Sequence, residues 1–414
     1  MKSEISKKLL IFSLYGIAAF PLLPEEILGL PVILLFISSV INFIETKKIN
    51  FNYKKLFIAT IPFILFLFSS FYSDDFSYAF KKVSGTRLSL LVVPLSFFLL
   101  KSESIQHIKS NLTKFQMLFS ISSLLLCVIY FTYLPFIEPS NNPAFVFPSG
   151  FFFKFAVNDI PYFHIEPVYF SFLITLSLIN TVHLFTTKKL NSFFFIIIII
   201  IYLSVVFLLV SKIAILFTIL FGAWFIFFKL KRKKISIILI ILALLIIYPI
   251  YQIPSIKYEV EELQYFYKGK KRAKDDSTQQ RYRVTKSSLD LAKQVNPLIG
   301  TGIGDVQKEL NEVYEKNNYE ELLTKKFDTH NQFISIFLGV GIIGLLGLMA
   351  HLISLIVLAF NKKFNYSLWA LLFIILQMFT ETVLERQLPV IVYSFLISFI
   401  LFLPKNLSFN KKRR

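Results

Sequence analysis

Long apolar stretches constrain this chain more than any other feature of its sequence. A helix that crosses a bilayer needs about 20 consecutive apolar residues. The apolar runs fall at residues 9–24, 28–45, 56–72, 86–100, 115–134, 162–185, 192–210, 213–228, 235–253, 331–361, 365–383 and 388–404. Hydrophobic residues make up 55% of the chain and charged residues only 17%, whereas about a quarter of a soluble protein is charged. A water-soluble globule is therefore excluded, and the sequence predicts an all-α polytopic membrane protein with about 12 transmembrane helices.

The charges predict how these helices are oriented. The chain has 44 Lys and Arg residues against 25 Asp and Glu residues, a formal net charge of +19. Short cytoplasmic loops of membrane proteins are enriched in Lys and Arg. With the N-terminus in the cytoplasm, 24 cations fall on the inner side, 6 in short outer connections and 14 in one long outer segment. Orientation in a lipid bilayer thus explains the basic excess, no nucleic-acid partner is predicted, and both termini are expected in the cytoplasm.

The same pattern predicts three parts. Residues 1–253 hold transmembrane helices one to nine, residues 254–330 form a large periplasmic loop, and residues 331–414 hold helices ten to twelve with a basic cytoplasmic tail. The loop is too long for a structureless connection in a compact domain. Its pattern predicts two or three helices, at Tyr258–Tyr267, Gln280–Val295 and Val306–Tyr314.

Two simpler features bound the chemistry. The chain has a single cysteine, Cys127, in the middle of an apolar run, which excludes an internal disulfide and a cysteine-ligated metal. Residues 1–8 are polar and basic, and the next apolar run leads into a second one, so no cleavable signal segment is expected.

Glycine is concentrated between the end of the loop and the start of the tenth helix. Gly300 and Gly302 follow Asn296-Pro297 closely and predict a sharp turn. Bare amides in such a turn can bind an anion; the alternative is a plain glycine-rich turn. Gly341 and Gly344 lie at the start of the tenth apolar run, where small residues allow close helix packing.

His330 lies where the loop meets this helix, and it belongs to a recognisable pattern. His330-Asn331, followed after nine residues by Gly341-Ile342-Ile343-Gly344, resembles the signature of the O-antigen ligase and polymerase family. Upstream, Arg281 and the stretch from Asn296 to Gly302 are similar to the family's arginine, helix and Asn-Pro-Leu-x-Gly-x-Gly sequence. The resemblance covers about residues 160–404 and includes the expected topology.

Two weaker matches and one departure accompany this signature. Ser211 to Ala214 resembles the family's Ser-Arg-x-Ala, with Lys212 in place of arginine. Glu381 to Gln387 resembles a motif of some members in a late helix. The family's tryptophan four residues after the loop arginine is replaced by Thr285, which leaves open whether Arg281 or Arg283 is the equivalent arginine.

The resemblance implies a glycosyltransferase of the bacterial inner membrane that moves a glycan from an undecaprenyl-pyrophosphate carrier to an acceptor at the periplasmic face. No cofactor is implied. No metal is predicted either, because Mg²⁺ and Ca²⁺ sites need carboxylate ligands and the sequence contains no Asp-x-Asp. His330 and Arg281 are the expected catalytic residues, with His330 as the general base in a single, inverting displacement. The alternative role of His330 is to orient the donor without a proton transfer. The expected ligands of pyrophosphate or glycan are Arg283, Lys212, Arg87, Asn331 and Glu166, and Gly300, Gly302, Gly341 and Gly344 are an expected structural motif.

Several alternatives stay open. Arg87 instead suits a side chain that reaches lipid phosphates, and Glu166 suits an ion pair with an arginine. The acceptor is lipid A-core in a ligase and a second glycan in a polymerase. The Arg-x10-Gly element of some polymerases is missing after Arg281 and Arg283, which favours the ligase. A transporter or flippase is a different class; such proteins usually carry acidic residues deep inside their helices, and none lies near the middle of a predicted span here.

Overall fold

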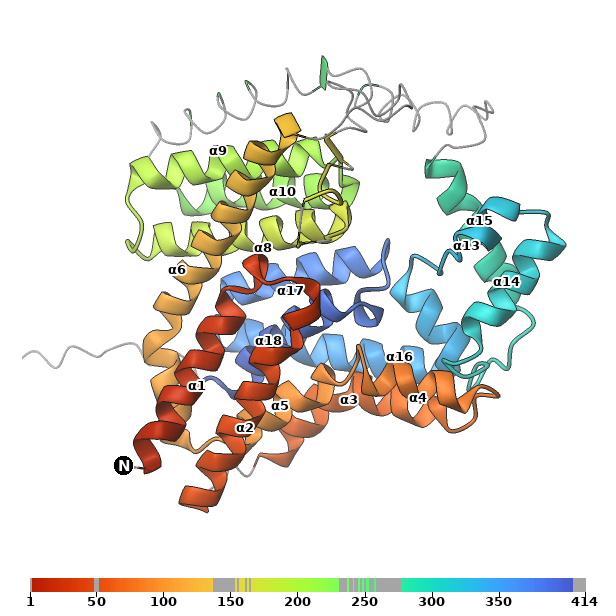
Figure 1. The fold of residues 1–414 in the computed structure, drawn as a ribbon, viewed down its shortest axis with the longest axis horizontal. Helices are drawn as coiled ribbons and strands as arrows, with labels where there is room; N and C mark the ends of the chain where they lie inside the picture. The colour runs from red at the N-terminus through yellow and green to blue at the C-terminus, as the bar shows by residue number, and fades with distance from the viewer. Residues whose placement is uncertain are drawn as a thin grey trace, which may run out of the picture. The chain divides into compact units, whose positions relative to one another are not determined.

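The computed structural model describes residues 2–47, 52–136, 165–230 and 277–404, with a few positions between 153 and 163 and between 237 and 257. Every regular element in these residues is helical, which confirms the predicted all-α class. The main helices are α1 (Lys2–Ala18), α2 (Gly29–Thr46), α3 (Tyr53–Ser70), α4 (Phe76–Ser84), α5 (Ser89–Leu99), α6 (Ser102–Tyr133), α8 (Pro167–Thr186), α9 (Ser192–Leu208), α10 (Lys212–Trp224), α13 (Ser277–Ala292), α14 (Val306–Lys316), α15 (Glu320–Thr324), α16 (Gln332–Asn361), α17 (Asn365–Met378) and α18 (Gln387–Phe402), drawn in Figure 1. Short 3₁₀ or π turns occur at Phe20–Leu22, Glu25–Ile27, Leu134–Phe136, Phe225–Lys229 and Val383–Glu385.

Six of the described helices are long and apolar enough to cross a membrane, and a seventh span results if α4 and α5, bent by 42° at their junction, count as one. The predicted count of about twelve is therefore not confirmed. Three of the expected spans fold as α9, α17 and α18, which have 17, 14 and 16 residues and are shorter than the about 20 that a straight span needs. The expected span at 235–253 lies almost wholly outside the described residues.

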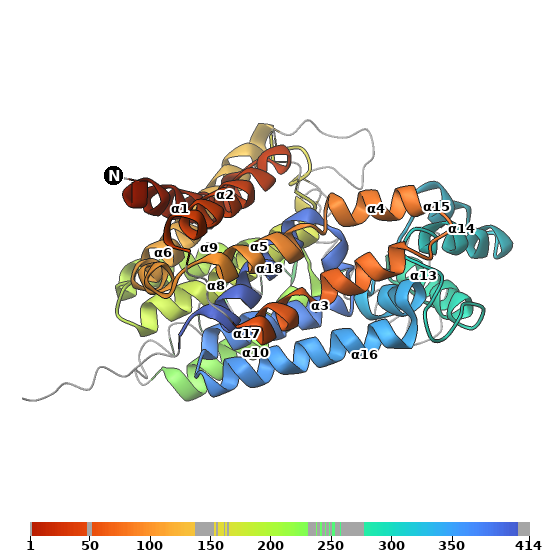
Figure 2. The same ribbon diagram turned by 90° about the horizontal axis from the view of Figure 1, so that it is seen from below.

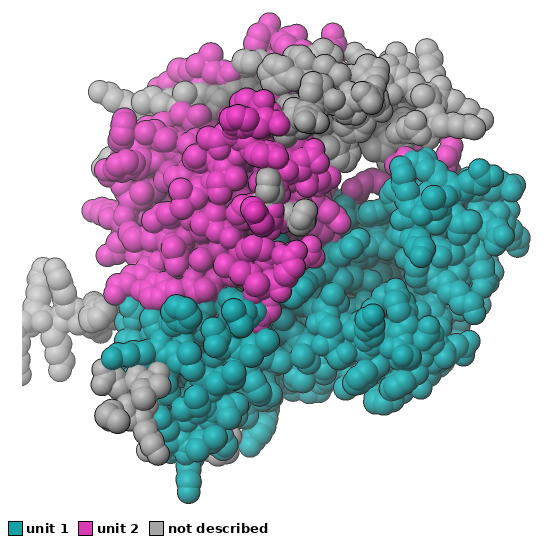
Figure 3. Space-filling model, in the orientation of Figure 1, with its two compact units in different colours: residues 1–14, 30–112, 284–414 teal, residues 15–29, 113–283 magenta. Residues whose placement is uncertain are grey.

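The chain forms two compact units, coloured separately in Figure 3. Unit 1 comprises Met1–Leu14, Leu30–Leu112 and Val284–Arg414, and unit 2 comprises Tyr15–Gly29 and Thr113–Arg283.

Unit 1 is built on four helices. α3 packs against α16 and α5, and α5 packs against α18; Figure 2 shows α16 running alongside α3. Phe97 of α5 is fully buried among aromatic rings of α18, meeting Phe395 and Phe399 edge-on and Phe402 in a stacked geometry. Aromatic side chains thus supply much of the contact between α5 and α18, in agreement with the 49 Phe residues of the chain.

A buried histidine joins three of these helices. Pro62 inside α3 has no N–H, so the carbonyl of Ile58 lacks its usual helical donor. His351 Nδ1 of α16 lies 2.6 Å from that carbonyl oxygen, and His351 Nε2 lies 2.6 Å from the hydroxyl of Tyr393 in α18. A carbonyl only accepts, so Nδ1 carries the proton and Nε2 accepts from the tyrosine. No role was expected for His351 from the sequence. In the structure its Nδ1–H takes the place of the backbone N–H that Pro62 lacks.

The helical part of the long loop packs as a small cluster in unit 1. Leu291 of α13, Leu310 and Tyr314 of α14, and Leu322 of α15 share a core with Leu338 of α16. The helices predicted at 280–295 and 306–314 are confirmed by α13 and α14, whereas the one predicted at 258–267 lies outside the described residues. Because Leu338 belongs to this core, the loop helices fix the first turns of α16.

Unit 2 contains α8, α9, α10 and most of α6. α8 packs against α9 and α10, and side-chain hydrogen bonds join α6 to its neighbours. Ser120 Oγ lies 3.1 Å from Thr181 Oγ1, Asn180 Nδ2 donates to the Gln116 carbonyl at 2.6 Å, and the Tyr202 hydroxyl donates to the Ser120 carbonyl at 2.6 Å. Hydrogen bonds between helices are typical of packing in an apolar medium.

Candidate functional site

The helix that follows His330 is broken after its first turns. Gly341 in α16 has φ 67° and ψ −164°, which no helix permits. The backbone groups released by the break pair with the glycine-rich loop: Thr301 N–H donates to the Leu338 carbonyl at 2.8 Å, and Ile342 N–H donates to the Pro297 carbonyl at 2.9 Å. The loop thus substitutes for the missing helical partners, as irregular backbone in a membrane protein requires.

The glycines of the loop make this close approach possible. Gly300 has φ +71°, and a Cβ there would lie 2.3 Å from the Leu338 carbonyl oxygen. Gly302 has φ +91°, and its Cβ would lie 2.3 Å from Ser73 Oγ. Gly344 lies against its own helix, where a Cβ would come within 2.4 Å of Val340. Close contact with neighbouring backbone or side-chain atoms explains why these positions need glycine.

The amides of the glycine-rich turn are occupied. Gly300 N–H donates to the Asn296 carbonyl at 2.8 Å, Gly302 N–H to the Gly339 carbonyl at 3.1 Å, and Gly304 N–H to Ser73 Oγ at 3.1 Å. An anion-binding turn would present these amides to a ligand. The contacts favour the plain-turn alternative.

Two further contacts hold the corner between α3 and α4 on this loop. The Tyr72 hydroxyl donates to the Ile299 carbonyl at 2.5 Å, and burial raises the pKa of Tyr72 to about 12. The Asp305 carboxylate accepts the backbone N–H of Asp74 at 2.8 Å and of Asp75 at 3.0 Å. These contacts hold the corner between α3 and α4 beside the start of α16. They also position the residues between α4 and α5, which follow the corner.

Because the Asp305 carboxylate binds the backbone of Asp74 and Asp75, several acidic side chains lie near one another at this corner. Burial raises the pKa of Glu309, and the neighbouring charges of Asp305, Glu312 and Asp74 add to the effect. Among the residues that the structure describes, no group of three or more His, Cys, Asp and Glu side chains is placed to hold a metal ion.

His330 is held in an uncommon backbone conformation by two acidic residues. Its φ is 44°, in the left-handed region that non-glycine residues seldom adopt. Its backbone N–H donates to Asp328 Oδ1 at 2.8 Å, and Thr382 Oγ1 donates to the other oxygen of Asp328 at 2.8 Å. His330 Nδ1 lies 3.1 Å from Glu381 Oε2. The loop before α16 is therefore joined to the segment between α17 and α18.

This geometry sets the chemistry of the imidazole. Glu381 is 5% exposed, whereas the side chain of His330 is 25% exposed. An ionised carboxylate only accepts hydrogen bonds, so Nδ1 carries the proton and Nε2 has the basic lone pair. Such a pair, with the carboxylate behind the ring, is the arrangement by which enzymes orient a histidine base and stabilise its charged form.

Asn331 has a structural task in this arrangement. Its Oδ1 accepts the backbone N–H of Phe333 at 3.0 Å and of Ile334 at 3.1 Å, which caps the N-terminus of α16. Its Nδ2 donates to the Phe379 carbonyl at 3.1 Å. These contacts position the neighbouring His330; the sequence-based expectation that Asn331 binds substrate stays a prediction.

Arg87 lies in the break between α4 and α5 and is 1% exposed. It does not extend toward lipid, which was the alternative interpretation. Its Nη2 is 3.2 Å from Glu385 Oε2, and the guanidinium lies over the ring of Phe66 at 4.0 Å. The Nε and Nη1 atoms of Arg87 are buried and have no hydrogen-bond partner among the described residues. A buried donor without an acceptor costs about 1–3 kcal/mol. An anionic ligand that accepted hydrogen bonds from these two nitrogen atoms would remove this cost.

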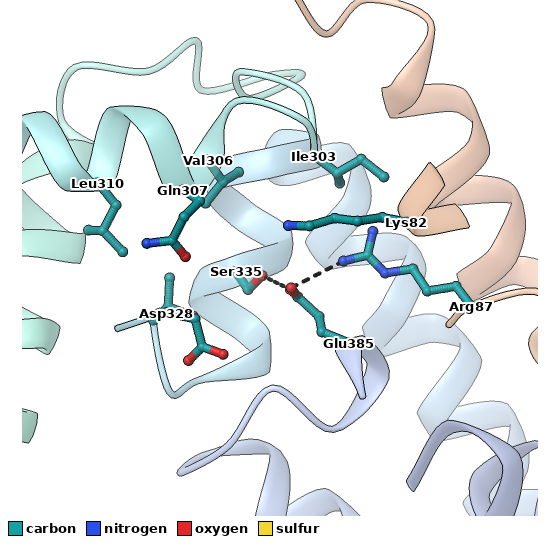
Figure 4. Close-up of a pocket in the computed structure, with 10 residues that line it drawn as sticks. Lys82, Arg87, Ile303, Val306, Gln307, Leu310, Asp328, Ser335 and Glu385 are labelled. Carbon is teal, nitrogen blue, oxygen red and sulfur yellow. Dashed lines mark hydrogen bonds and ion pairs between the residues drawn. The ribbon is translucent and has the colours of Figure 1, made fainter. Parts of the chain in front are cut away.

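A small cavity adjoins this guanidinium, shown in Figure 4. Its volume of about 20 Å³ accommodates about one water molecule. Figure 4 shows the Lys82 and Arg87 side chains reaching the cavity side by side, with Glu385 between Arg87 and Ser335. The Ser335 hydroxyl donates to Glu385 Oε1. The other lining residues are Ile303, Val306, Gln307, Leu310, Asp328 and Thr329.

Four of the expected site residues belong to unit 2. Lys212 is the first residue of α10, and its Nζ lies 3.3 Å from Thr278 Oγ1 in the first turn of α13. Arg281 and Arg283 follow on the same helix, Arg281 exposed and Arg283 partly buried. The contact between Lys212 and Thr278 joins the start of α10 to the start of α13, the helix that carries Arg281 and Arg283. Glu166 precedes α8 and is exposed, and its carbonyl accepts the first helical N–H groups.

Lys82 and Asp328 were not singled out from the sequence, and Glu381 and Glu385 were named only as parts of a supporting motif. A signal was present, because the 40 residues from 365 to 404 contain three charged side chains, Glu381, Glu385 and Arg386, within six positions. Charges are expensive in an apolar segment and usually have a partner or a function. The partners themselves lie at distant positions of the chain and follow only from the fold.

Comparison with known families bears on the same region. Residues 194–349 match the family model described as O-antigen ligase. The matched stretch contains His330 and the glycine-rich motif, while Arg87, Glu381 and Glu385 lie outside it. No curated protein matches the chain. The match and the apolar helices support a membrane glycosyltransferase of the O-antigen ligase or polymerase type. The match at residues 194–349 supports the resemblance of the chain to the O-antigen ligase family.

Proposed function

We propose that this protein transfers a glycan from undecaprenyl pyrophosphate to an acceptor such as lipid A-core at the periplasmic face of the bacterial inner membrane. The observation that carries the proposal is the contact of 3.1 Å between His330 Nδ1 and the buried carboxylate of Glu381. It gives the family's histidine the partner that a general base needs. No metal takes part in the proposed reaction.

The base acts on the acceptor. With Nδ1–H directed to Glu381, Nε2 of His330 takes the proton from the acceptor hydroxyl as its oxygen attacks the anomeric carbon. The bond between this carbon and the phosphate oxygen breaks, and its electron pair leaves on the pyrophosphate. The new bond forms on the opposite face of the sugar, so the configuration inverts. Glu381 stabilises the imidazolium that results.

The leaving group needs positive charge. Charge develops on the phosphate oxygens in the transition state, and preorganised cations placed there lower the barrier. Arg87 has two buried nitrogen atoms without a partner among the described residues, and Lys82 lines the same cavity. Arg281, Arg283 and Lys212, at the start of α13 and α10, are proposed as further ligands of the pyrophosphate or glycan.

A polymerase is the nearest alternative. It uses the same carrier and needs the same base, and it differs in the acceptor, which is a second glycan on its own carrier. The absence of the Arg-x10-Gly element favours the ligase.

Deletion of the gene in its host tests the function. Carrier-linked polymer that accumulates, with no glycan on lipopolysaccharide, indicates a ligase, and a single repeat unit left on the core indicates a polymerase. Wild-type protein should restore the polysaccharide on a gel, and a stably expressed His330→Ala variant should not. An unchanged polysaccharide in the deletion strain would contradict both assignments.

A further inference from the structure

Glu385 occupies the edge of Arg87 that a phosphate would need. Its Oε2 lies 3.2 Å from Arg87 Nη2, and the side chain of Glu385 is 17% exposed while that of Arg87 is 2% exposed. The Ser335 hydroxyl holds the other oxygen of Glu385. The carboxylate is therefore a contact that bridges the α4–α5 break and the first turns of α16.

This ion pair leaves the guanidinium incompletely bound. Arginine and a carboxylate pair most strongly through two parallel hydrogen bonds, but here a single nitrogen of Arg87 faces Glu385. The Nε and Nη1 atoms are buried and without a partner among the described residues. The arrangement neutralises the charge of Arg87 without using its remaining donors.

The cavity beside the pair is too small for a phosphate. It has room for about one water molecule, so an anion that reaches Arg87 must move a lining side chain. Glu385 is the lining group with the strongest reason to move, because its carboxylate and a phosphate on the same guanidinium would repel each other. Lys82 would remain as a second cation at the wall.

We propose that Glu385 is a displaceable counter-ion of the phosphate site. It stabilises the buried charge of Arg87 while the site is empty, and it gives up the guanidinium when the pyrophosphate group of the donor enters. This inference rests on the proposed function, since it concerns the same pyrophosphate. It adds an order of events: the ion pair opens when donor binds and re-forms when the carrier leaves.

The return of Glu385 has a consequence for turnover. Transfer of the glycan leaves a terminal phosphate on the carrier, whose negative charge is greater than that of the donor. The returning carboxylate competes with this product for Arg87 and promotes its release. Without the carboxylate, donor and product both bind more tightly, so the KM for the donor and kcat both fall.

Binding measurements test the inference. Purified full-length protein in detergent is titrated calorimetrically with inorganic pyrophosphate and, separately, with undecaprenyl pyrophosphate. The Glu385→Gln variant should bind at least about tenfold more tightly than wild type, which corresponds to about 1.4 kcal/mol. Glu385→Asp, which withdraws the charge by one methylene group, should bind more tightly than wild type by a smaller factor. The matched control Asp290→Asn, which removes an exposed charge paired with Lys293, should bind as wild type does.

The outcomes separate the inference from the proposed function. If Arg87→Gln and Lys82→Gln weaken binding but neither Glu385 variant strengthens it, the counter-ion role is refuted and the phosphate site stands. If the Arg87 and Lys82 variants bind both ligands as wild type does, the phosphate site itself is refuted. Tighter binding of undecaprenyl pyrophosphate by the Glu385 variants supports the proposal and identifies the lipid carrier as the source of the anion. Tighter binding confined to inorganic pyrophosphate would contradict it, because the site would then not take the pyrophosphate of the donor.

Discussion

The break in α16 at Gly341 allows a sharp test of how the site is held. Its φ of 67° and ψ of −164° lie in a region that is essentially restricted to glycine. A Cβ at this position would lie 2.3 Å from both the carbonyl carbon and the carbonyl oxygen of Leu298. Backbone atoms cannot yield as a flexible side chain does, so Gly341→Ala must separate the loop at 297–302 from α16.

The cost follows from these contacts. A non-glycine residue in this conformation costs about 1–3 kcal/mol. Separation of the loop also breaks the bonds from Ile342 N–H to the Pro297 carbonyl and from Ile343 N–H to the Leu298 carbonyl, 2.9 and 3.4 Å long. At about 1 kcal/mol for each hydrogen bond, the free energy of unfolding should fall by about 3–5 kcal/mol in all.

Thermal unfolding in detergent and glycan transfer measure the effect together. Gly341→Ala should lower Tm by about 5 °C and reduce transfer more than tenfold, because the displaced turns of α16 follow directly on His330. Gly222→Ala is the control: it lies in α10, a Cβ there meets nothing within 4 Å, and alanine is favoured over glycine in a helix by about 1 kcal/mol. A Gly341→Ala protein with unchanged Tm and transfer, or an equal loss in Gly222→Ala, would refute the reasoning.

His351→Leu leaves the Ile58 carbonyl and the Tyr393 hydroxyl without their partner and should lower the free energy of unfolding by about 2–4 kcal/mol. His107→Leu, at an exposed position, should leave Tm unchanged. Equal Tm values for the two variants would contradict the stabilising role of His351. The raised pKa of Glu309 means that the folded protein binds its proton more strongly than the unfolded chain, so this group lowers stability as pH rises from the unfolded value of 4.5 through the folded pKa. Glu309→Gln should therefore have a higher Tm than wild type at pH 7 and lose this advantage near pH 4; a difference in Tm that does not vary with pH would count against it. Transfer by purified protein should continue at the same rate in EDTA, and a loss that Mg²⁺ restores would show that a metal takes part.

Much of the secondary structure was predictable from the apolar runs, because hydrophobicity over about 20 residues is a local property. The runs at 365–383 and 388–404 became α17 and α18, but their helices are shorter than the runs. The residues that separate them, 379–386, fold into an irregular segment with a 3₁₀ turn at Val383–Glu385. Hydropathy does not register where a helix ends when the segment beyond it is apolar too.

No helix was predicted in the connection between the third and fourth apolar runs. Residues 76–84 form α4, whose Asp75 cap accepts the Tyr78 N–H at 2.9 Å. The cap is a local signal and was open to recognition. The burial of Arg87 was not, because it depends on Glu385, 298 positions further along the chain, and on the Phe66 ring.

The residues of the site also fall into those that a short motif predicted and those whose contacts follow only from the fold. The family signature predicted His330, whose importance is visible in a short motif. Glu381 was visible only as one acid in an apolar region, since its contact with His330 joins positions 51 residues apart. The glycines were predicted as a structural motif; the structure adds that Gly300 and Gly341 each permit a backbone contact with the other's segment.

The central claim is that His330, oriented by Glu381, is the base of glycan transfer. The most direct measurement is the rate of transfer from undecaprenyl-pyrophosphate-linked glycan to acceptor by purified protein in lipid vesicles, for wild type, His330→Ala, Glu381→Gln and the control His107→Ala. A positioned general base contributes about 10²–10⁴-fold, so we expect His330→Ala to lose at least about a hundredfold, Glu381→Gln to lose a smaller factor, and His107→Ala to match wild type. Full transfer by a folded His330→Ala protein would contradict the account.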